Sequence, residues 1–480
     1  MEKKLEKKYG LITAMCMVIG IVIGSGVFFK AEGMLTVTGG DLPIALFAWL
    51  LGGTVMVISA YVFAVMGTRF EKVNGVVDYS EALIGSDYAY YTGWFMTTIY
   101  YPAMTSALAW LTARYTMTVF GDPAKAVTSA ETMTLAAFFM CFSFAVNALA
   151  PKLAGKFQVS TTFIKLIPLI LMAVVGIIYG LKTGTLTENF ANVIDDAGKA
   201  VPSSGLSWNK LIPGVCTSVF AYEGWIIATT INSEIKDSKK NLPRALVLGT
   251  LIVVVIYILY YMGISGSVPT SELMAEGGGA SYAFMQRFGK VAGTILTVFI
   301  AVSCFGTLNG LTVACCRGFY SIAARNRGPK PTFLKSIDDE SKMPANASIL
   351  ALVCISAWLF YFYIANLSSI GGGMGIFAFD STELPLVCVY AFYLPIYIMF
   401  MVKGKEFGPF KRFVMPALAF AGACLFIYAS IVKHGIKNLG FLVIALVIML
   451  VAFIFRNGEK HNLKETAVKE SVKEPVKETV

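Results

Sequence analysis

The first residues with the types and spacing to bind a ligand lie in "VIGIVIGSGVFF", residues 18–29, where Gly24, Ser25 and Gly26 interrupt an apolar run. Glycine weakens a helix, and a break within hydrocarbon leaves amides and carbonyls that protein or a ligand must satisfy. The freed amides of Ser25, Gly26 and Val27 would begin a half-helix, whose positive end suits a carboxylate. A packing patch for a neighbouring helix is the alternative explanation of these small residues.

A second interruption lies in "SVFAYEGW", residues 218–225, within another apolar segment. There the carbonyls of Phe220 and Ala221 would close a half-helix, whose negative end suits an ammonium group. A site that offers both backbone poles at short range matches the zwitterionic head of an α-amino acid. Glu223 adds a carboxyl group beside this break.

Membrane helices are the elements that must position these stretches. Of the 480 residues, 56% are hydrophobic and 14% are charged, against roughly 25% charged in soluble domains. A spanning helix needs about 20 mostly apolar residues. Windows free of Asp, Glu, Lys and Arg cover residues 11–29, 42–68, 88–113, 132–151, 166–181, 245–271, 291–316, 345–379, 384–402, 413–432 and 438–455. Adding 211–233, which contains Glu223, the sequence predicts an all-α integral membrane protein with twelve transmembrane helices.

The two breaks fall near the midpoints of the first and sixth predicted spans, at Ile23 and Tyr222. Interrupted helices at corresponding positions indicate an inverted-repeat transporter with its site at the repeat interface. We therefore expect a five-plus-five inverted repeat with discontinuous helices 1 and 6. The predicted units are a cytoplasmic N-terminus (1–10), helices 1–5 (11–181), helices 6–10 (182–402), helices 11–12 (403–456) and a disordered cytoplasmic tail (457–480).

The distribution of basic residues predicts the orientation. Most of the 39 Lys and Arg residues fall in the two terminal segments and in the loops that share their side, including 69–87 and 325–342. Because cytoplasmic loops carry the excess of Lys and Arg, both termini are expected in the cytoplasm of a multi-pass protein of the cell membrane. The net charge of +10 follows from this topology, so the lipid bilayer and not nucleic acid is the expected partner.

Cysteine and histidine usage argues against other classes of protein. All nine cysteines fall in predicted spans, which disfavours a disulfide framework and a disulfide-linked partner in an outer loop. Only two histidines are present, one in a loop and one in the tail. We therefore expect no metal site, no cofactor, no enzymatic activity and no obligate protein partner.

Three blocks resemble a known family. "IGSGVFF" after a basic amino terminus, "FAYEGW" followed by "INSEIKDSKKNLPRAL", and "SCFGTLNGLTVACCRGFYSIAARNRGPKP" are similar to the amino acid-polyamine-organocation superfamily, and within it to the L-type amino acid transporters and their bacterial relatives. The resemblance covers spans 1 to 10 and weakens beyond them. It implies the five-plus-five repeat with two extra helices.

The resemblance also implies roles for individual residues. Backbone amides of the first break would hold the substrate carboxylate, Phe220 would close over the substrate from the outer side, and carbonyls near Ala221 would bind the amino group. The candidate substrate-binding residues are Val22, Ile23, Gly24, Ser25, Gly26, Val27, Phe220, Ala221, Tyr222, Glu223 and Gly224.

Lys165, in "TTFIKLIPL", matches a fifth-helix lysine whose ammonium stands where sodium-coupled relatives place an ion, which implies sodium-independent transport. A charge near the centre of a span costs about 2.5–3.5 kcal/mol on insertion scales, so it requires partners. We expect carbonyls at the end of the first half-helix and a hydroxyl from span 8, such as Ser303. A lysine that extends to the inner surface is the alternative.

Glu223 has three competing interpretations. Many L-type members have glycine there, although some bacterial relatives have an acid. The carboxyl group would bind a cationic substrate side chain, take up and release a proton during transport, or turn away from the substrate and tie the unwound segment to a neighbouring span.

Other polar residues have structural explanations. Asp380 and Glu383 have the spacing of a capping box, although a role in recruiting cationic substrates is the alternative. Tyr100, Tyr101 and Asn309 would line the side-chain pocket or bond to neighbouring helices.

These observations predict a secondary amino acid transporter that works by alternating access, as a sodium-independent exchanger of neutral amino acids. Small side chains at Ser25, Gly26 and Ala221, with aromatic walls from Phe220 and Tyr222, suit an apolar or small polar substrate. The alternatives are a proton-coupled permease or amine exchanger for cationic amino acids, if Glu223 faces the pocket, and a channel or sensor without transport.

Overall fold

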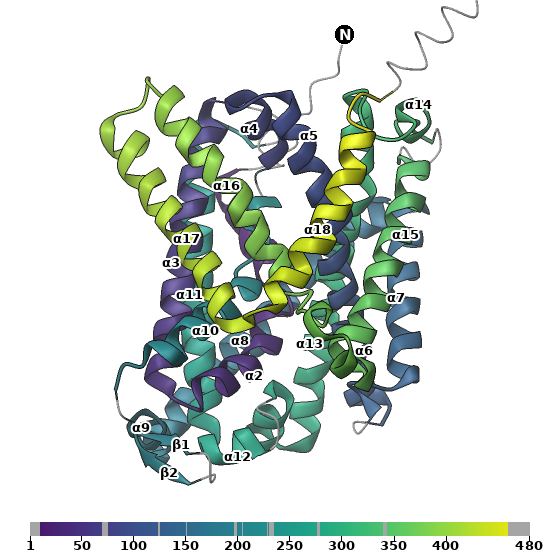
Figure 1. The fold of residues 1–480 in the computed structure, drawn as a ribbon. Coiled ribbons are helices and arrows are strands. Elements are labelled where there is room, and N and C mark those ends of the chain that lie inside the picture. The colour runs from purple at the N-terminus through teal and green to yellow at the C-terminus, as the bar shows by residue number, and fades with distance from the viewer. Residues whose placement is uncertain are drawn as a thin grey trace, which may run out of the picture.

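The chain is almost entirely helical (Figure 1). The computed structural model describes residues 10–69, 75–122, 125–149, 151–195, 199–203, 205–227, 229, 235–275, 279–338 and 343–458. The predicted tail lies outside the described residues apart from Asn457 and Gly458, as does the N-terminal segment apart from Gly10.

The helices and strands have the following bounds: α1 Leu11–Val22, α2 Gly26–Thr38, α3 Leu42–Arg69, α4 Val76–Leu83, α5 Ser86–Phe95, η1 Met96–Tyr100, α6 Tyr101–Phe120, α7 Ala130–Leu149, α8 Pro151–Thr183, α9 Thr185–Ala191, β1 Asn192–Ile194, β2 Ala200–Pro202, α10 Trp208–Ala221, α11 Ser238–Ser267, α12 Thr270–Ala275, α13 Ala280–Ala324, α14 Pro331–Leu334, α15 Ala345–Phe362, η4 Tyr363–Leu367, η5 Ser369–Gly373, η6 Gly375–Phe377, α16 Leu384–Lys403, η7 Phe410–Val414, α17 Met415–His434 and α18 Lys437–Ile454.

Long apolar helices form the body of the protein. Within the described ranges, nine helices are long and apolar enough to cross a membrane, or ten if the bent pair α1 and α2 counts as one span. Two short strands, β1 and β2, form an antiparallel hairpin in which Val193 pairs with Val201. The all-α membrane class predicted from the sequence is therefore confirmed. The predicted unit boundaries stay predictions.

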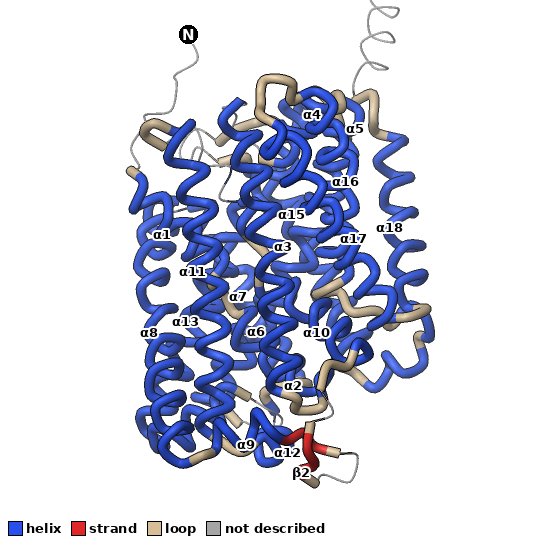
Figure 2. The backbone as a smooth tube through the Cα atoms, turned by 90° about the vertical axis from the view of Figure 1, so that its left-hand side faces the viewer, coloured by secondary structure: helices blue, strands red, loops and turns tan. Residues whose placement is uncertain are grey.

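The connecting elements gather at the two ends of the helical bundle (Figures 1 and 2). At one end lie α4, α5 and α14, and at the other lie α9, the β-hairpin and α12. In the sequence, α4 belongs to the loop 69–87 and α14 to the loop 325–342, both predicted inside, whereas α9 and the hairpin belong to the loop 182–210, predicted outside. The two groups of loops are thus separated as alternating spans require.

Small residues allow a close crossing of α8 and α11. A Cβ on Gly176 of α8 would collide with the backbone carbonyl of Gly263 in α11, and one on Gly263 would collide with the carbonyl of Met172. Helices in membranes associate through such close packing because lipid supplies little hydrophobic drive between them. The core around the two broken helices is rich in aromatic side chains, and Trp49, Tyr257 and Trp225 are fully buried.

Candidate functional site

The first break lies where the sequence places it. The helix α1 ends at Val22, residues 23–25 bend, and α2 begins at Gly26. The two half-helices meet at 47°. The first amides of a helix have no acceptor within that helix, so the start of α2 presents backbone donors at this bend.

The second break is in direct contact with the first. Helix α10 ends at Ala221, and Gly224 takes a φ of +103°, a conformation that other residues rarely adopt. A Cβ on Gly26 would lie 2.6 Å from the Cα of Ala221 and 3.2 Å from the carbonyl oxygen of Phe220. The amide start of α2 and the carbonyl end of α10 therefore lie side by side, and only glycine at position 26 permits this approach.

Two side chains satisfy the carbonyl end of α1. Lys165 Nζ of α8 donates to the carbonyl oxygen of Gly20 at 3.0 Å, and the Tyr257 hydroxyl of α11 donates to that of Val22 at 3.1 Å. Lys165 is fully buried, so it does not extend to the inner surface. Its ammonium group also donates to Thr307 Oγ1 of α13 at 3.1 Å.

The hydroxyl partner of Lys165 is Thr307 and not the predicted Ser303. Thr307 takes that role one helical turn further along α13, while the Ser303 hydroxyl is buried with no hydrogen-bond partner in the described part of the chain. Residues four apart share one face of a helix, so the predicted helix and face are right and the turn is wrong.

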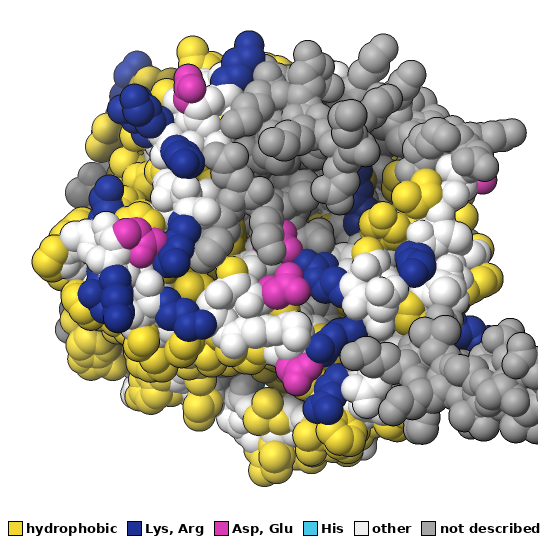
Figure 3. Space-filling model, turned by 90° about the horizontal axis from the view of Figure 1, so that it is seen from above, with side chains coloured by type: hydrophobic (Ala, Val, Ile, Leu, Met, Phe, Trp, Pro, Cys, Tyr) yellow, Lys and Arg dark blue, Asp and Glu magenta, His cyan; other side chains and the backbone are white. Residues whose placement is uncertain are grey.

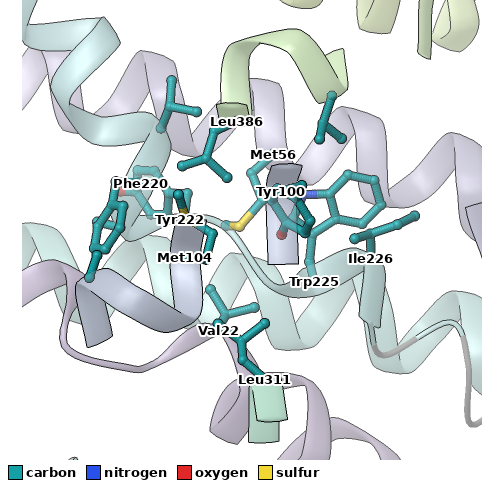
Figure 4. Close-up of a cluster of buried hydrophobic side chains, with 14 of the residues drawn as sticks. Val22, Met56, Tyr100, Met104, Phe220, Tyr222, Trp225, Ile226, Leu311 and Leu386 are labelled. Atoms are coloured by element: carbon teal, nitrogen blue, oxygen red, sulfur yellow. The ribbon is translucent and has the colours of Figure 1, made fainter. Parts of the chain in front are cut away.

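A cavity of about 230 Å³ lies at the junction of the two breaks. Figure 4 shows apolar side chains from α1, α6, α10 and α13 converging in this region, among them Val22, Met104, Phe220 and Leu311. The lining residues are Ile21, Val22, Gly24, Ser25, Gly26, Tyr100, Met104, Leu108, Phe220, Ala221, Glu223, Gly224, Ile227, Thr307, Gly310, Leu311 and Val313. The surroundings suit a small molecule with a polar head and an apolar side chain.

Most predicted binding residues line this cavity, but some do not. Ile23 and Val27 are buried nearby and are not among its lining residues. Tyr222 was expected to form an aromatic wall, and this is wrong. Its hydroxyl donates to the carbonyl oxygen of Trp49 at 2.9 Å and its ring packs on Trp49 and Tyr257. In the irregular turn after α10, the side chain of Tyr222 points into helix packing, and Phe220 alone of the two rings lines the cavity.

The remaining pocket candidates separate in space. Tyr100 lines the central cavity, Tyr101 lines a second cavity, and Asn309 lines neither. Asn309 Oδ1 accepts a hydrogen bond of 2.8 Å from Asn147 of α7. Asn309 therefore bonds to a neighbouring helix, which was the alternative interpretation of this residue.

Glu223 lines the central cavity and also bonds to a neighbouring helix. It lines the cavity, and its Oε1 accepts a hydrogen bond of 2.7 Å from the Tyr100 hydroxyl, which ties the unwound segment to the helical stretch of η1 and α6. Its other oxygen is buried, and no side chain among the described residues donates to it. The carboxyl group is thus anchored on one oxygen and retains hydrogen-bonding capacity on the other.

A cluster of charged residues lies beside Phe220. Lys30 Nζ is 5.1 Å from the centre of the Phe220 ring and 2.6 Å from Glu383 Oε1. Lys433 Nζ and His434 Nε2 approach the same carboxylate at 2.7 and 3.0 Å. We call Lys30, Glu383, Lys433 and His434 the Glu383 cluster. It joins α2 to the start of α16 and the end of α17.

The capping prediction for the Asp380–Glu383 pair holds only in part. Asp380 Oδ1 accepts from the amide of Glu383 at 3.2 Å, as a cap does. The Glu383 side chain instead forms the buried ion pairs of the Glu383 cluster. Cys216, Glu383 and His434 also have ligand atoms within 4.8 Å of one another, the spacing of a metal site. The two ammonium groups already on Glu383 oppose a further cation there.

A second cavity, of about 430 Å³, adjoins the first. The two share Ile227, Gly310 and Val313 as lining residues. The second cavity extends along α13 to Ala324 and to Met343, at the end of the molecule where α4 and α14 lie. The central cavity is therefore continued toward this end of the molecule. Phe220 lies between the central cavity, which it lines, and Lys30 of the Glu383 cluster.

Sequence reasoning missed several residues of the site. Met104, Leu108 and Leu311 form apolar walls, and Tyr257 and Thr307 hold the first break. Each lies within an apolar helix and not at a break such as residues 23–25, so a single sequence carries no signal that distinguishes it from packing residues.

The geometry defines a class of protein: a helical membrane protein with a small-molecule site between two broken helices. Comparison with known proteins identifies the family. The model of the amino acid permease family matches residues 9–454, so the chain belongs to this family. It is a multi-pass membrane protein of a family of transporters.

Individual relatives share less than a third of their aligned residues with this chain. The serine/threonine exchanger SteT of Bacillus subtilis is 29% identical over 427 residues, which cover 87% of this chain and 90% of SteT. The human cystine/glutamate transporter is 24% identical over 72% of this chain and 66% of its own length. The human large neutral amino acids transporter small subunit 2 is 26% identical over 74% of this chain and 64% of its own. The match thus spans about two thirds of each human protein.

Proposed function

We propose that this protein is a sodium-independent exchanger of neutral amino acids that works by alternating access. The observation that carries the proposal is the contact between the two breaks, where the amide start of α2 and the carbonyl end of α10 border one cavity. The functions of two relatives, serine/threonine exchange and large neutral amino acid transport, agree with this site.

Within the proposed site, the substrate carboxylate binds the amides of Ser25, Gly26 and Val27, and the ammonium group binds the carbonyls of Phe220 and Ala221. The side chain then extends among Met104, Leu108 and Leu311, which line the cavity. These apolar walls favour a neutral side chain because burying an unpaired charge in them is costly.

Lys165 supports the proposal of sodium independence. Its ammonium group bonds to the end of α1 and to Thr307 of α13. At this place a covalently attached cation holds α1 and α13 together, as a bound ion would. Because it stays with the chain in every state, transport needs no sodium gradient.

The proposed topology has twelve spans in a five-plus-five inverted repeat, in the cell membrane with both termini cytoplasmic. Figure 3 views the end that carries α4 and α14, and Lys and Arg side chains are spread over this face. Such a basic surface supports a cytoplasmic location of this end. We propose no obligate protein partner.

A proton-coupled permease or amine exchanger for cationic amino acids is the second candidate, and the position of Glu223 favours it. This residue lines the cavity and keeps one oxygen without a side-chain donor in the described ranges. That oxygen has the capacity to accept a bond from a basic substrate side chain or to carry a proton.

One experiment separates these functions. The purified chain is reconstituted alone in liposomes loaded with a mixture of amino acids, and uptake of each labelled amino acid is measured with and without sodium and across a pH gradient. We expect exchange of neutral amino acids at a rate that depends neither on sodium nor on the pH gradient. Uptake that requires sodium would contradict the role of Lys165, and the absence of any exchange would contradict the proposed function or the independence from a partner chain.

The variant Glu223→Gln tests the second candidate in the same assay. Loss of pH dependence with retained exchange would assign proton coupling to this residue, and loss of cationic substrates alone would assign it to their binding. Unchanged uptake would leave the structural bond to Tyr100. Tyr100→Phe is the matched control, because it removes that bond and leaves the carboxyl group.

A further inference from the structure

Arg317 lies on the face of α13 that lines the second cavity. Gly310, Ala314, Arg317 and Ser321 all border this cavity, at the spacing of one helical face. Gly310 also borders the central cavity, and Arg317 follows it by two helical turns, about 10 Å along the axis. The arginine therefore stands between the central site and the end of the molecule that carries α4 and α14.

Two arginines that follow the end of α13 pair with acidic residues. Arg325 contacts Asp78 at 2.6 Å, and Arg327 contacts Asp87 at 2.6 Å. The hydrogen bond from Arg327 lowers the pKa of Asp87. In contrast, no described residue accepts a hydrogen bond from Arg317, and its side chain is exposed within the cavity.

An arginine within an apolar helix is costly unless it faces water or a partner, and such residues commonly mark the path of a transported solute. The guanidinium group presents a planar fork of donors that matches a carboxylate with two parallel bonds. Tyr101 and Tyr320 also border the cavity with hydroxyl groups. Small side chains at Gly310 and Ala314 leave space between this arginine and the central site.

We propose that Arg317 binds the carboxylate of the amino acid in the second cavity, as a station between the central site and the cytoplasmic solution. The inference rests on the proposed function and adds a second binding position to it. Because its charge repels basic side chains, the station also disfavours cationic amino acids that enter from the cytoplasmic side. Inorganic anions such as chloride share the chemistry of this ligand.

The test measures exchange separately from the two sides of the membrane. Proteoliposomes are sorted by orientation with an affinity tag, and KM is determined at each face for the neutral amino acid that the wild type exchanges fastest. For Arg317→Gln we expect KM at the cytoplasmic face to rise at least fivefold, with KM at the outer face changed less than twofold. L-lysine should inhibit more strongly at the cytoplasmic face of this variant than in the wild type.

Two further variants make the outcome specific. Arg317→Lys keeps the charge but loses the planar fork, so its cytoplasmic KM should lie between those of the wild type and Arg317→Gln. Arg327→Gln, which removes an arginine from the same end of the molecule, should leave both KM values within twofold. Replacing chloride by gluconate should not change the wild-type values, and a chloride-dependent cytoplasmic KM would assign the site to chloride instead.

Other results would overturn the inference. An equal change of KM at both faces, or a change in maximal rate alone, would show that Arg317 supports the fold or the conformational change. Unchanged KM values in Arg317→Gln would show that the carboxylate does not bind there. A wild type without exchange would remove the proposed function itself, and the station would fall with it.

Discussion

Replacing Glu383 by glutamine is expected to destabilise the protein strongly. The carboxylate is fully buried and contacts Lys30 at 2.6 Å, Lys433 at 2.7 Å and His434 at 3.0 Å. The lysine side chains are only 6% and 17% exposed, so a neutral amide leaves two nearly buried ammonium groups without the carboxylate that they contact. Breaking one buried pair costs about 3–5 kcal/mol. The second lysine is more exposed and adds less, because water screens it.

The assay is thermal unfolding of the purified protein in detergent, followed by intrinsic fluorescence. A loss of about 4 kcal/mol corresponds to a fall in Tm of about 8 °C, with about 2 °C per kcal/mol for large domains. The matched control is Glu32→Gln, because Glu32 contacts Arg114 at 3.0 Å with side chains that are 32% and 18% exposed. This more exposed pair should contribute about 1 kcal/mol.

A double variant tests the cause of the destabilisation. Adding Lys433→Met to Glu383→Gln removes one of the uncompensated charges, so the double variant should unfold at a higher temperature than Glu383→Gln alone. A Tm for Glu383→Gln no lower than that of Glu32→Gln would refute the reasoning. A double variant that is less stable than the single one would also refute it.

Three other substitutions test the broken helices and their supports. Gly26→Val should reduce exchange at least tenfold without preventing membrane insertion, because a Cβ would lie 2.6 Å from the backbone of Ala221; near-normal exchange would show that the two breaks separate easily. Lys165→Met should also reduce exchange at least tenfold at every sodium concentration, and activity restored by sodium would instead reveal a vacated ion site. Asp78→Asn removes one of two acidic partners of Arg325 and leaves Glu81 at 3.6 Å; since that arginine is also 21% exposed, Tm should fall less than in Glu383→Gln, and an equal or larger fall would contradict the reasoning.

The positions of both breaks could be predicted from the sequence because glycine in an apolar run is a local signal. The partners of Lys165 could be predicted only to the helix. A buried ammonium must find oxygen atoms, but Ser303 and Thr307 lie on one face of α13, and their spacing does not decide which of them is reached. The direction of Tyr222 could not be predicted either, since an irregular turn has no period from which to read a side-chain direction.

Long-range contacts were beyond prediction for a different reason. Glu383 has an adequate local explanation as part of a cap, so its spacing concealed the ion pair with Lys30, which lies 353 positions earlier in the chain. The same holds for the second cavity. Arg317 could be recognised as a charge within a span, but its freedom from Asp78 and Asp87 is visible only once the ends of α13, α4 and α5 are placed together.

The ammonium group of Lys165 also limits the energy available to the proposed transport cycle. A dissolved ion that enters with the substrate and leaves on the other side contributes the free energy of its own gradient. A cation tethered to α8 stays on the protein through the whole exchange cycle and contributes none. Each tenfold difference in amino acid concentration is worth about 1.4 kcal/mol, and an exchanger of this kind has only such differences to draw on. It would therefore alter the composition of a cell's amino acid pool while leaving the total number of molecules unchanged.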